Sequence, residues 1–388
     1  MSHGGLRGGT AVVGVAESDL GEVGAGRYSI ELAAQAAVRA LDDAGLGKND
    51  VDGLFGVLSR HVLPSVDIGE YLGIRPRYTD STMIGGSSFV SYLHHAAQAL
   101  IAGACDVALI VYGSTSRSAS RQGRASAPVV DGPNYERAYR PRGAMSGYAL
   151  AAARHMYQYG TTREQLAEVA VAARAWARLN PVAFKRGPLT VEDVLARPML
   201  SSPFTSLDCC LTTDGGGAAV MVRAERARDL RERPVYLLGA GEAHWHSSIS
   251  QMPDLTVSAT RDSAARAFTM AGLRPADIDV VELYDAFTIN TIMFLEDLGF
   301  CAKGEGGAFV SDGRIAPGGE LPVNTNGGGL SYCHPGMYGI FTIIEAVRQI
   351  RGEAGVRQQS DVHTAVAHGN GGQLSAQATV ILGDQAAL

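Results

Sequence analysis

Residues 37–46 read AVRALDDAGL, and residues 264–273 read AARAFTMAGL. Each stretch is followed, at the same spacing, by an acidic turn, DVD at residues 50–52 and DID at residues 277–279. A glycine directly after an alanine-rich periodic segment is typical of a helix that ends in a left-handed cap. The shared spacing of helix, cap and turn predicts a duplicated chain. Each copy is expected to continue into a strand, at residues 53–58 and 280–283.

The two halves continue in parallel beyond these strands. The first reaches GGSSF (residues 85–89), a helix to about residue 103 and a buried strand after Asp106. The second reaches GGLSYCHPG (residues 328–336), a helix, and strands that begin near residues 364 and 378. Strands that alternate with helices predict mainly parallel sheets covered on both faces. The expected fold is α/β, a five-layered αβαβα sandwich with shared helices between two sheets.

A segment of different composition separates the halves. Residues 117–197 carry thirteen Lys or Arg and six Asp or Glu, in a chain whose net charge is −6. We therefore expect an inserted loop domain at 114–206, an N-terminal half at 1–113 and 207–230, and a C-terminal half at 231–388. A solvated loop domain explains this charge equally well. The functional interpretation is a basic cap over a phosphorylated ligand, because arginine matches phosphate in geometry and charge.

Composition excludes several classes of protein. A chain of 388 residues predicts two or more domains, and its acidic balance argues against general nucleic-acid binding. Five cysteines without metal spacing predict reduced thiols in the cytoplasm and no metal site. The N-terminal apolar run, residues 11–16, is too short for a signal peptide. The uncharged segment 81–104 contains histidines and small polar residues, so we expect a buried helix and no membrane span.

The segment NTNGGGLSYCHPGMYG, residues 324–339, concentrates glycine around His334 and precedes an amphipathic helix at 340–350. Glycine at this density indicates close approach of the backbone to another group. A helix N-terminus lowers the pKa of a histidine, which is then neutral and able to accept a proton. The alternative is a glycine-rich connection with a hydrogen-bonded histidine.

Six separated stretches occur in a characteristic order: GGSSF (85–89), DCCLTTDGGGAA (208–219), VELYDAF (281–287), GFCAKGEGGAF (299–309), NTNGGGLSYCHPGMYG (324–339) and HGNGG (368–372). Through them the chain resembles the thiolase superfamily, near the sterol-carrier-protein-type thiolases and lipid-transfer proteins, over essentially its whole length. The resemblance implies the duplicated thiolase fold with a loop domain and usually a homodimer. It also implies acyl-CoA substrates, with coenzyme A as part of the substrate and no tightly bound cofactor.

The chemistry departs from the family pattern. A thiolase has a nucleophilic cysteine at the start of the first half's buried helix, where this chain has Ser87 or, at one residue's uncertainty, Ser88. Related thiolases usually have histidine at the position of Tyr284. His368 matches their second acid–base cysteine, and His334 is kept. Cys333 adjoins His334 and is an alternative nucleophile, although it lies where the family has glycine.

Without the cysteine, the resemblance implies a retro-aldol cleavage of a β-hydroxyacyl-CoA, which needs enolate stabilisation and proton transfer but no covalent intermediate. Members of the family perform it on steroid side chains, releasing a ketone and a short acyl-CoA, together with a small zinc-ribbon/OB-fold subunit. The expected catalytic residues are Tyr284, His334, Tyr338, His368 and Ser87. The expected oxyanion or substrate-binding residues are Ser88, Asp285, Asn326, Gly328 and Gly371.

Two other functions remain open. One is an acyl-CoA acyltransferase or thiolase with a different nucleophile. The other is a non-catalytic acyl-CoA or lipid-binding subunit of a complex. Several candidate residues also have ordinary roles: a core tyrosine for Tyr284, packing at a helix start for Tyr338, an N-cap for Ser87 and a strand end for His368. The sequence leaves open which of them is acid or base, and which acyl group is bound.

Overall fold

The computed structural model describes residues 5–123 and 135–388. The strands are β1 (Thr10–Glu17), β2 (Gly53–Val57), β3 (Tyr78–Asp80), β4 (Val107–Ser114), β5 (Met199–Ser201), β6 (Phe204–Thr205), β7 (Gly215–Arg223), β8 (Val235–His244), β9 (Val280–Leu283), β10 (Thr364–Gly371) and β11 (Ala376–Gly383). The helices are α1 (Ser29–Ala44), α2 (Pro64–Leu72), α3 (Ser88–Ile101), α4 (Ser116–Arg121), α5 (Ala144–Tyr159), α6 (Arg163–Leu179), α7 (Val191–Leu195), α8 (Ala224–Ala227), α9 (Thr260–Ala271), α10 (Thr288–Leu298), α11 (Gly306–Phe309) and α12 (Gly339–Arg351).

The duplication is visible in the sheet. Within the described residues the main sheet has nine strands in the order β3-β2-β4-β7-β1-β8-β11-β10-β9. The order β2-β4-β7-β1 is repeated in reverse as β8-β11-β10-β9, with the same sense of pairing at each step. The halves meet where β1 pairs with β8, at Ala11–Tyr236 and Val12–Val235. The sheet is therefore built from two related units.

The expectation of mainly parallel sheets was wrong. Only β2 with β3, β2 with β4 and β9 with β10 pair in parallel among the described strands. β7 and β11 each lie antiparallel to both of their neighbours. The strand–helix alternation was correct for β2–β4 and β9–β10. It does not extend to β7, which follows the insert, or to β11, which follows β10 through a tight turn.

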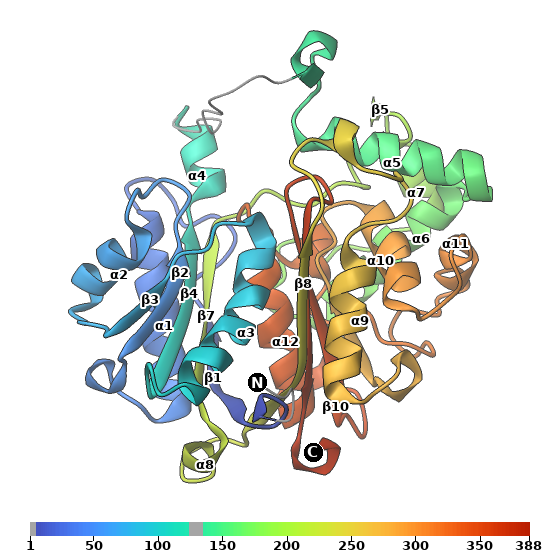
Figure 1. Ribbon diagram of the computed structural model, residues 1–388. Coiled ribbons are helices and arrows are strands. Elements are labelled where there is room, and N and C mark those ends of the chain that lie inside the picture. Colours follow the sequence, from blue (N-terminus) through green and yellow to red (C-terminus); the bar gives the residue numbers. More distant parts are fainter. Residues whose placement is uncertain (1–4, 124–134) are drawn as a thin grey trace.

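The layers follow the expected sandwich (Figure 1). Helices α3 and α12 lie in the middle and contact each other, and each contacts strands of both halves. Helix α1 covers β1, β4 and β7 on one outer face of the sandwich, and α9 covers β8 and β11 on the other outer face. In α3, Phe89, Tyr92 and Leu93 are fully buried, as the uncharged sequence of this segment predicts. The core is therefore continuous between the halves.

The repeated helices end as their sequences predict. Helix α1 is capped by Gly45 at φ 70° and α9 by Gly272 at φ 66°. This left-handed conformation favours glycine, because a Cβ would crowd the backbone there. Short 3-10 turns at Lys48–Asp50 and Pro275–Asp277 then lead into β2 and β9. The sequence therefore placed the repeated helix, cap, turn and strand correctly.

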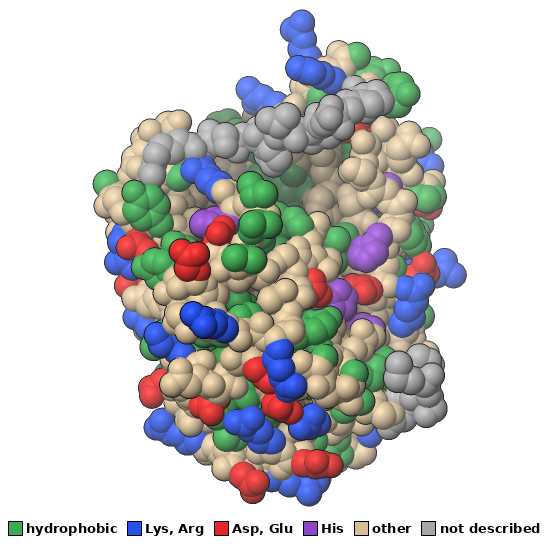
Figure 2. Space-filling view, turned by 60° about the vertical axis from the view of Figure 1, so that its left-hand side comes forward, with side chains coloured by type: hydrophobic (Ala, Val, Ile, Leu, Met, Phe, Trp, Pro, Cys, Tyr) green, Lys and Arg blue, Asp and Glu red, His purple; other side chains and the backbone are tan. Residues whose placement is uncertain are grey.

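Helices α4 to α7 and the hairpin β5–β6 lie within the segment between the halves, and α5 to α7 lie over one end of the molecule (Figure 1). Basic side chains gather at the upper end of the face drawn in Figure 2, whereas charges of both signs are interspersed below. No helix in the described ranges is long and apolar enough to cross a membrane.

Candidate active site

Three connections meet at one end of the central helices. The chain leaving β9 supplies Tyr284 and Asp285. A π-helical turn at Gly328–Tyr332 and the residues after it supply His334 and Tyr338, which directly precedes α12. A 3-10 turn at Gly85–Ser87 leads into α3. The duplicated architecture thus brings equivalent helix starts, α3 and α12, together beside the end of β9.

Tyr284, His334 and Tyr338 form one cluster. The Tyr284 hydroxyl lies 2.9 Å from Nε2 of His334 and 3.4 Å from the carbonyl oxygen of Gly336. The ring of Tyr338 lies 5.7 Å from that of Tyr284 and 6.4 Å from that of His334. His334 is partly exposed, whereas Tyr338 is fully buried. The structure therefore joins three of the expected catalytic residues.

Burial sets the protonation states of this cluster. It lowers the pKa of His334 to about 4 and raises the pKa of the Tyr284 and Tyr338 phenols well above their usual value. All three side chains are consequently neutral at pH 7. A neutral imidazole in contact with a neutral phenol is able to accept its proton, so the pair is suited to proton transfer.

The ring of Tyr284 lies directly on Gly86, a residue that the sequence interpretation did not single out. A Cβ at position 86 would lie 1.9 Å from Cε2 of Tyr284. Gly371 packs equally closely, since its Cβ would lie 1.8 Å from the carbonyl oxygen of Ile84. The glycines of GGSSF and HGNGG thus make room for the tyrosine and for each other. The glycine pair in GGSSF was the sequence signal that another group approaches closely at this point.

Asn326 fixes Tyr338. Its Oδ1 accepts hydrogen bonds from the Tyr338 hydroxyl at 2.8 Å and from the backbone N–H of Gly328 at 2.8 Å. Asn326 is buried, and its own backbone carbonyl accepts from Nδ2 of Asn180 at the end of α6. The Tyr338 hydroxyl is therefore held by the glycine-rich segment.

Asp285 anchors the π-helical turn. Its carboxyl group accepts from the backbone N–H of Gly329 at 2.6 Å and of Leu330 at 3.4 Å. Gly328 leaves space for it, because a Cβ there would lie 2.0 Å from Oδ2 of Asp285. Burial nevertheless raises the pKa of Asp285 to about 7. Asp285 and Gly328 thus shape the segment that carries His334.

The two serines have occupied hydroxyl groups. Ser87 donates to the carbonyl oxygen of Ala376 on β11 at 2.6 Å, and Oγ of Ser88 accepts from the N–H of Ile84 at 3.0 Å. Both side chains are fully buried. These bonds fix the start of α3 against β11 and hold the turn that carries Gly86.

His368 lies on the other side of its strand. Its Nδ1 lies 2.9 Å from the Thr379 hydroxyl, and its Nε2 lies 3.1 Å from both the Thr260 hydroxyl and Oε1 of Gln377. Burial lowers the pKa of His368 to about 3. Only its backbone carbonyl meets the cluster, accepting from the N–H of Tyr284 at 3.0 Å. The structure therefore does not bring its ring to the tyrosines.

The cysteines offer no thiolate. Cys333 is fully buried, and burial raises its pKa well above the usual value. Burial also raises the pKa of Cys105 to about 11, of Cys209 and Cys301 to about 12, and of Cys210 further. Cys210 is partly exposed and donates its backbone N–H to the carbonyl of Ala286, so it belongs to the wall of the site.

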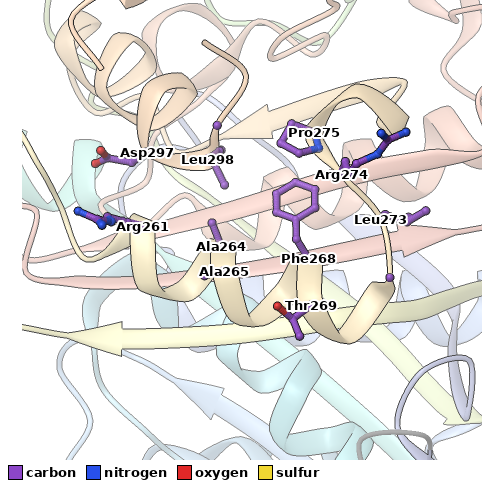
Figure 3. A pocket seen from close by; sticks show the side chains of 12 residues that line it. Arg261, Ala264, Ala265, Phe268, Thr269, Leu273, Arg274, Pro275, Asp297 and Leu298 are labelled. Carbon is purple, nitrogen blue, oxygen red and sulfur yellow. The ribbon is translucent and has the colours of Figure 1, made fainter. Parts of the chain in front are cut away.

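A separate groove of about 570 Å³ runs beside α9 (Figure 3). Ala264, Phe268 and Pro275 line it, and Asp297 borders it. Asp297 is already paired with Lys303. None of the expected site residues lines this groove. In the part of the chain that the structure describes, no group of three or more His, Cys, Asp or Glu side chains is arranged to hold a metal ion.

Known proteins share this architecture. A family model described as "Thiolase C-terminal domain-like" matches residues 241–384. The acetyl-CoA acetyltransferase of Methanothermobacter thermautotrophicus is 34% identical over 93% of this chain and 96% of that protein. The 17-hydroxy-3-oxo-4-pregnene-20-carboxyl-CoA lyase of Mycobacterium tuberculosis is 34% identical over 94% and 97%. The solved "Ltp2-ChsH2(DUF35) aldolase" superposes with a TM-score of 0.88 at 31% identity, covering 98% of each chain.

Proposed function

Because the chain belongs to the thiolase superfamily, in the branch of the sterol-carrier-protein-type thiolases, we propose that it is a lyase that cleaves a β-hydroxyacyl-CoA by a retro-aldol reaction. The substrate we propose is of the steroid side-chain type, giving a ketone and a short acyl-CoA. The relative named as a steroid carboxyl-CoA lyase supports this substrate class.

One observation carries the proposal. The Tyr284–His334 pair occupies the space beside Gly86 at the start of α3, and every cysteine has a raised pKa. Covalent acyl transfer needs an accessible thiolate, whereas retro-aldol cleavage needs only proton transfer and a site for an enolate. The neutral Tyr284–His334 pair supplies the proton transfer.

The proposed reaction moves one proton and breaks one carbon–carbon bond. The Tyr284 hydroxyl passes its proton to Nε2 of neutral His334 as it takes the proton of the substrate's β-hydroxyl group. The β-oxygen then forms a carbonyl, the Cα–Cβ bond breaks, and its electron pair forms the thioester enolate. The proton returns through Tyr284 to Cα, which gives the shortened acyl-CoA. Preorganised donors at such an enolate are worth roughly 3 kcal/mol each.

The alternative function is acyl transfer, which the similarity to an acetyl-CoA acetyltransferase favours. Among the thiols, Cys210 lies in the wall of the site, and its backbone is bonded to Ala286. Thiolysis consumes free coenzyme A, whereas retro-aldol cleavage does not. The requirement for free coenzyme A therefore separates the two functions.

We also propose that the segment 114–206 caps the acyl-CoA, that the chain forms a homodimer, and that a small zinc-ribbon/OB-fold subunit completes the active complex. The basic side chains at the upper end of the molecule support a phosphorylated ligand there. The name of the solved Ltp2-ChsH2(DUF35) aldolase joins two components, which supports a partner subunit.

The test is turnover of β-hydroxyacyl-CoA and β-ketoacyl-CoA esters, alone and with candidate OB-fold subunits. We expect a ketone and an acyl-CoA from the hydroxy esters without added coenzyme A. Tyr284→Phe should lower kcat by roughly 10²- to 10⁴-fold, because it removes the transferred proton. Tyr71→Phe, at a tyrosine that is 54% exposed on α2, is the matched control and should leave turnover unchanged. Cleavage that requires free coenzyme A, or survives in Tyr284→Phe, contradicts the proposal.

A further inference from the structure

Two buried glutamates meet at one hydroxyl group beneath the site. The Thr325 hydroxyl oxygen lies 2.9 Å from Oε1 of Glu282 and 2.7 Å from Oε1 of Glu345. Nε2 of Gln349 donates to the same oxygen at 3.0 Å, and the Thr325 backbone N–H donates to Oε1 of Glu282 at 3.1 Å. Glu282 is fully buried, and Glu345 is 1% exposed. Two carboxyl groups thus compete for a single hydroxyl hydrogen.

The hydrogen bonds around Thr325 fix the protonation states of the two glutamates. Glu345 receives two hydrogen bonds from one guanidinium, because Nε and Nη2 of Arg357 lie 2.8 Å from Oε1 and Oε2. A paired guanidinium of this geometry requires an ionised carboxylate, which has no proton to give. The Thr325 hydroxyl therefore donates to Glu345. The 2.9 Å contact with Glu282 is then a hydrogen bond only if Glu282 carries the proton.

The remaining oxygen of Glu282 agrees with this assignment. Oε2 is buried and has no hydrogen-bond partner in the described part of the chain. An unpaired carboxylate oxygen in such a place is costly, whereas the carbonyl oxygen of a neutral acid is less so. Burial, reinforced by the charge of Glu345, raises the pKa of Glu282 well above its usual value.

Thr325 lies in the turn that orients Tyr338. Before it, Oδ1 of Asn324 accepts from the N–H of Leu283 at 2.6 Å, and Asn324 has φ 54°. After it, Oδ1 of Asn326 holds the Tyr338 hydroxyl at 2.8 Å. We propose that Glu282 is an uncharged carboxylic acid that donates its proton to Thr325, and that it positions this turn and the Tyr338 hydroxyl. The catalytic part of this inference rests on the proposed lyase function.

Glu282→Gln does not reproduce the neutral acid. The atom next to Thr325 must accept from the backbone N–H and donate to the hydroxyl oxygen, and only an O–H group does both. An amide oxygen there accepts from both groups and removes the donor to Glu345. An amide nitrogen there would place one N–H donor against another, the backbone N–H of Thr325, so that no hydrogen bond forms between them. We therefore expect the amide variant to lose the geometry of the turn.

Infrared difference spectroscopy at pH 7 tests the protonation state without substrate. The infrared spectrum of the wild type minus that of Glu282→Gln should show the carbonyl band of an unionised carboxylic acid. Asp285, whose pKa is about 7 and which lies beside the altered turn, is replaced by Asn in both proteins of this comparison so that it contributes no carboxyl band. A difference spectrum with only carboxylate bands overturns the neutral acid. An enzyme that fails to cleave any β-hydroxyacyl-CoA leaves this test intact, so the two proposals fail separately.

A pair of variants tests the positioning role. Thr325→Val removes the hydroxyl and should lower kcat by roughly tenfold with less than about threefold change in KM, because a displaced hydroxyl impairs the reaction more than binding. Thr325→Ser keeps the hydroxyl and should stay within about threefold of the wild type. Ile381→Val, at a fully buried residue of β11, controls for general loss of core packing and should leave kcat unchanged.

Labelled tyrosine gives a reading that does not depend on turnover. With ¹³C in the tyrosine rings and the Tyr338 signal assigned through Tyr338→Phe, that signal should move in Thr325→Val and stay in place in Thr325→Ser. Unchanged signals in both variants, or kcat of Thr325→Val equal to that of the wild type, overturn the positioning role.

Discussion

The phenol ring of Tyr284 depends on Gly86 having no side chain. Gly86→Ala places a methyl group 1.9 Å from Cε2 of Tyr284, and this carbon is part of a rigid ring. We expect the ring to move away from His334, with a loss of about 1–3 kcal/mol of stability from overpacking and a fall in kcat close to that of Tyr284→Phe. Chemical denaturation and steady-state kinetics measure both effects.

Gly187→Ala is the matched control for that variant. Nothing lies within 4 Å of a Cβ at position 187, and its φ is not in the left-handed region. Its stability and kcat should equal those of the wild type. If Gly86→Ala had wild-type kinetics, the Tyr284 ring would not depend on the space beside Gly86, and the prediction would be wrong.

His334 makes stability depend on pH. Its folded pKa, about 4, lies below the usual value of about 6.5, so the unfolded chain binds a proton first as pH falls. The stabilisation is therefore complete above pH 6.5 and is lost between pH 6.5 and about 4. His334→Gln lacks this slope. We expect the free energy of unfolding of the wild type to fall by roughly 2 kcal/mol more than that of the variant between pH 7 and 5. Parallel curves of unfolding free energy against pH for the wild type and His334→Gln would contradict this prediction.

The sequence predicted the residues of the cluster better than their surroundings. Tyr284, His334 and Tyr338 lie on segments that carry clear motifs, and the structure joins them. His368 lies on a strand buried on both faces, where hydrophobic pattern does not tell which side a residue faces. A shift of one residue turns a side chain to the opposite side. The ring of His368 consequently packs toward α9, and Gly369 faces Ser87.

A buried network joins α5 to α10 and to Lys303, which follows α10. His155 on α5 contacts Glu296 on α10 at 3.0 Å, and Nζ of Lys303 lies 3.0 Å from Glu296 and 2.5 Å from Asp297. Both carboxyl groups are buried, so the lysine offsets charges that water does not reach. The local sequence gave no sign of this network, because His155 lies 141 residues before Glu296 in the chain.

Lys303→Met leaves the two carboxyl groups without their cation. We expect it to destabilise the protein by about 3–5 kcal/mol, since an uncompensated buried charge remains. Differential scanning calorimetry measures the shift in Tm. Lys48→Met, at an exposed lysine in the turn before β2, is the control and should shift Tm little. Equal shifts in both variants would show that the network contributes nothing.

The two halves are also connected by ions across the middle of the molecule. Glu17 at the end of β1 accepts from Nη1 and Nη2 of Arg348 on α12 at 2.6 and 2.5 Å, and Asp43 on α1 pairs with Arg351. With the β1–β8 pairing and the shared central helices, these contacts join the two halves through one continuous core. We therefore expect the halves to unfold together.

Glu17→Gln tests this coupling. Removing the carboxylate leaves Arg348 without its partner and should cost about 3 kcal/mol, while unfolding remains a single transition by fluorescence and circular dichroism. Glu320→Gln, at a side chain that is 76% exposed, should have almost no effect. Two separate transitions in either protein would show that the halves are independent.

The contact between Gly86 and Tyr284 also limits how the site can be redesigned. A side chain at position 86 and an aromatic ring at position 284 exclude each other. A laboratory lineage that enlarges residue 86 therefore has to shrink residue 284 first. Libraries of single substitutions at position 86 should recover no variant that keeps the activity of the wild type.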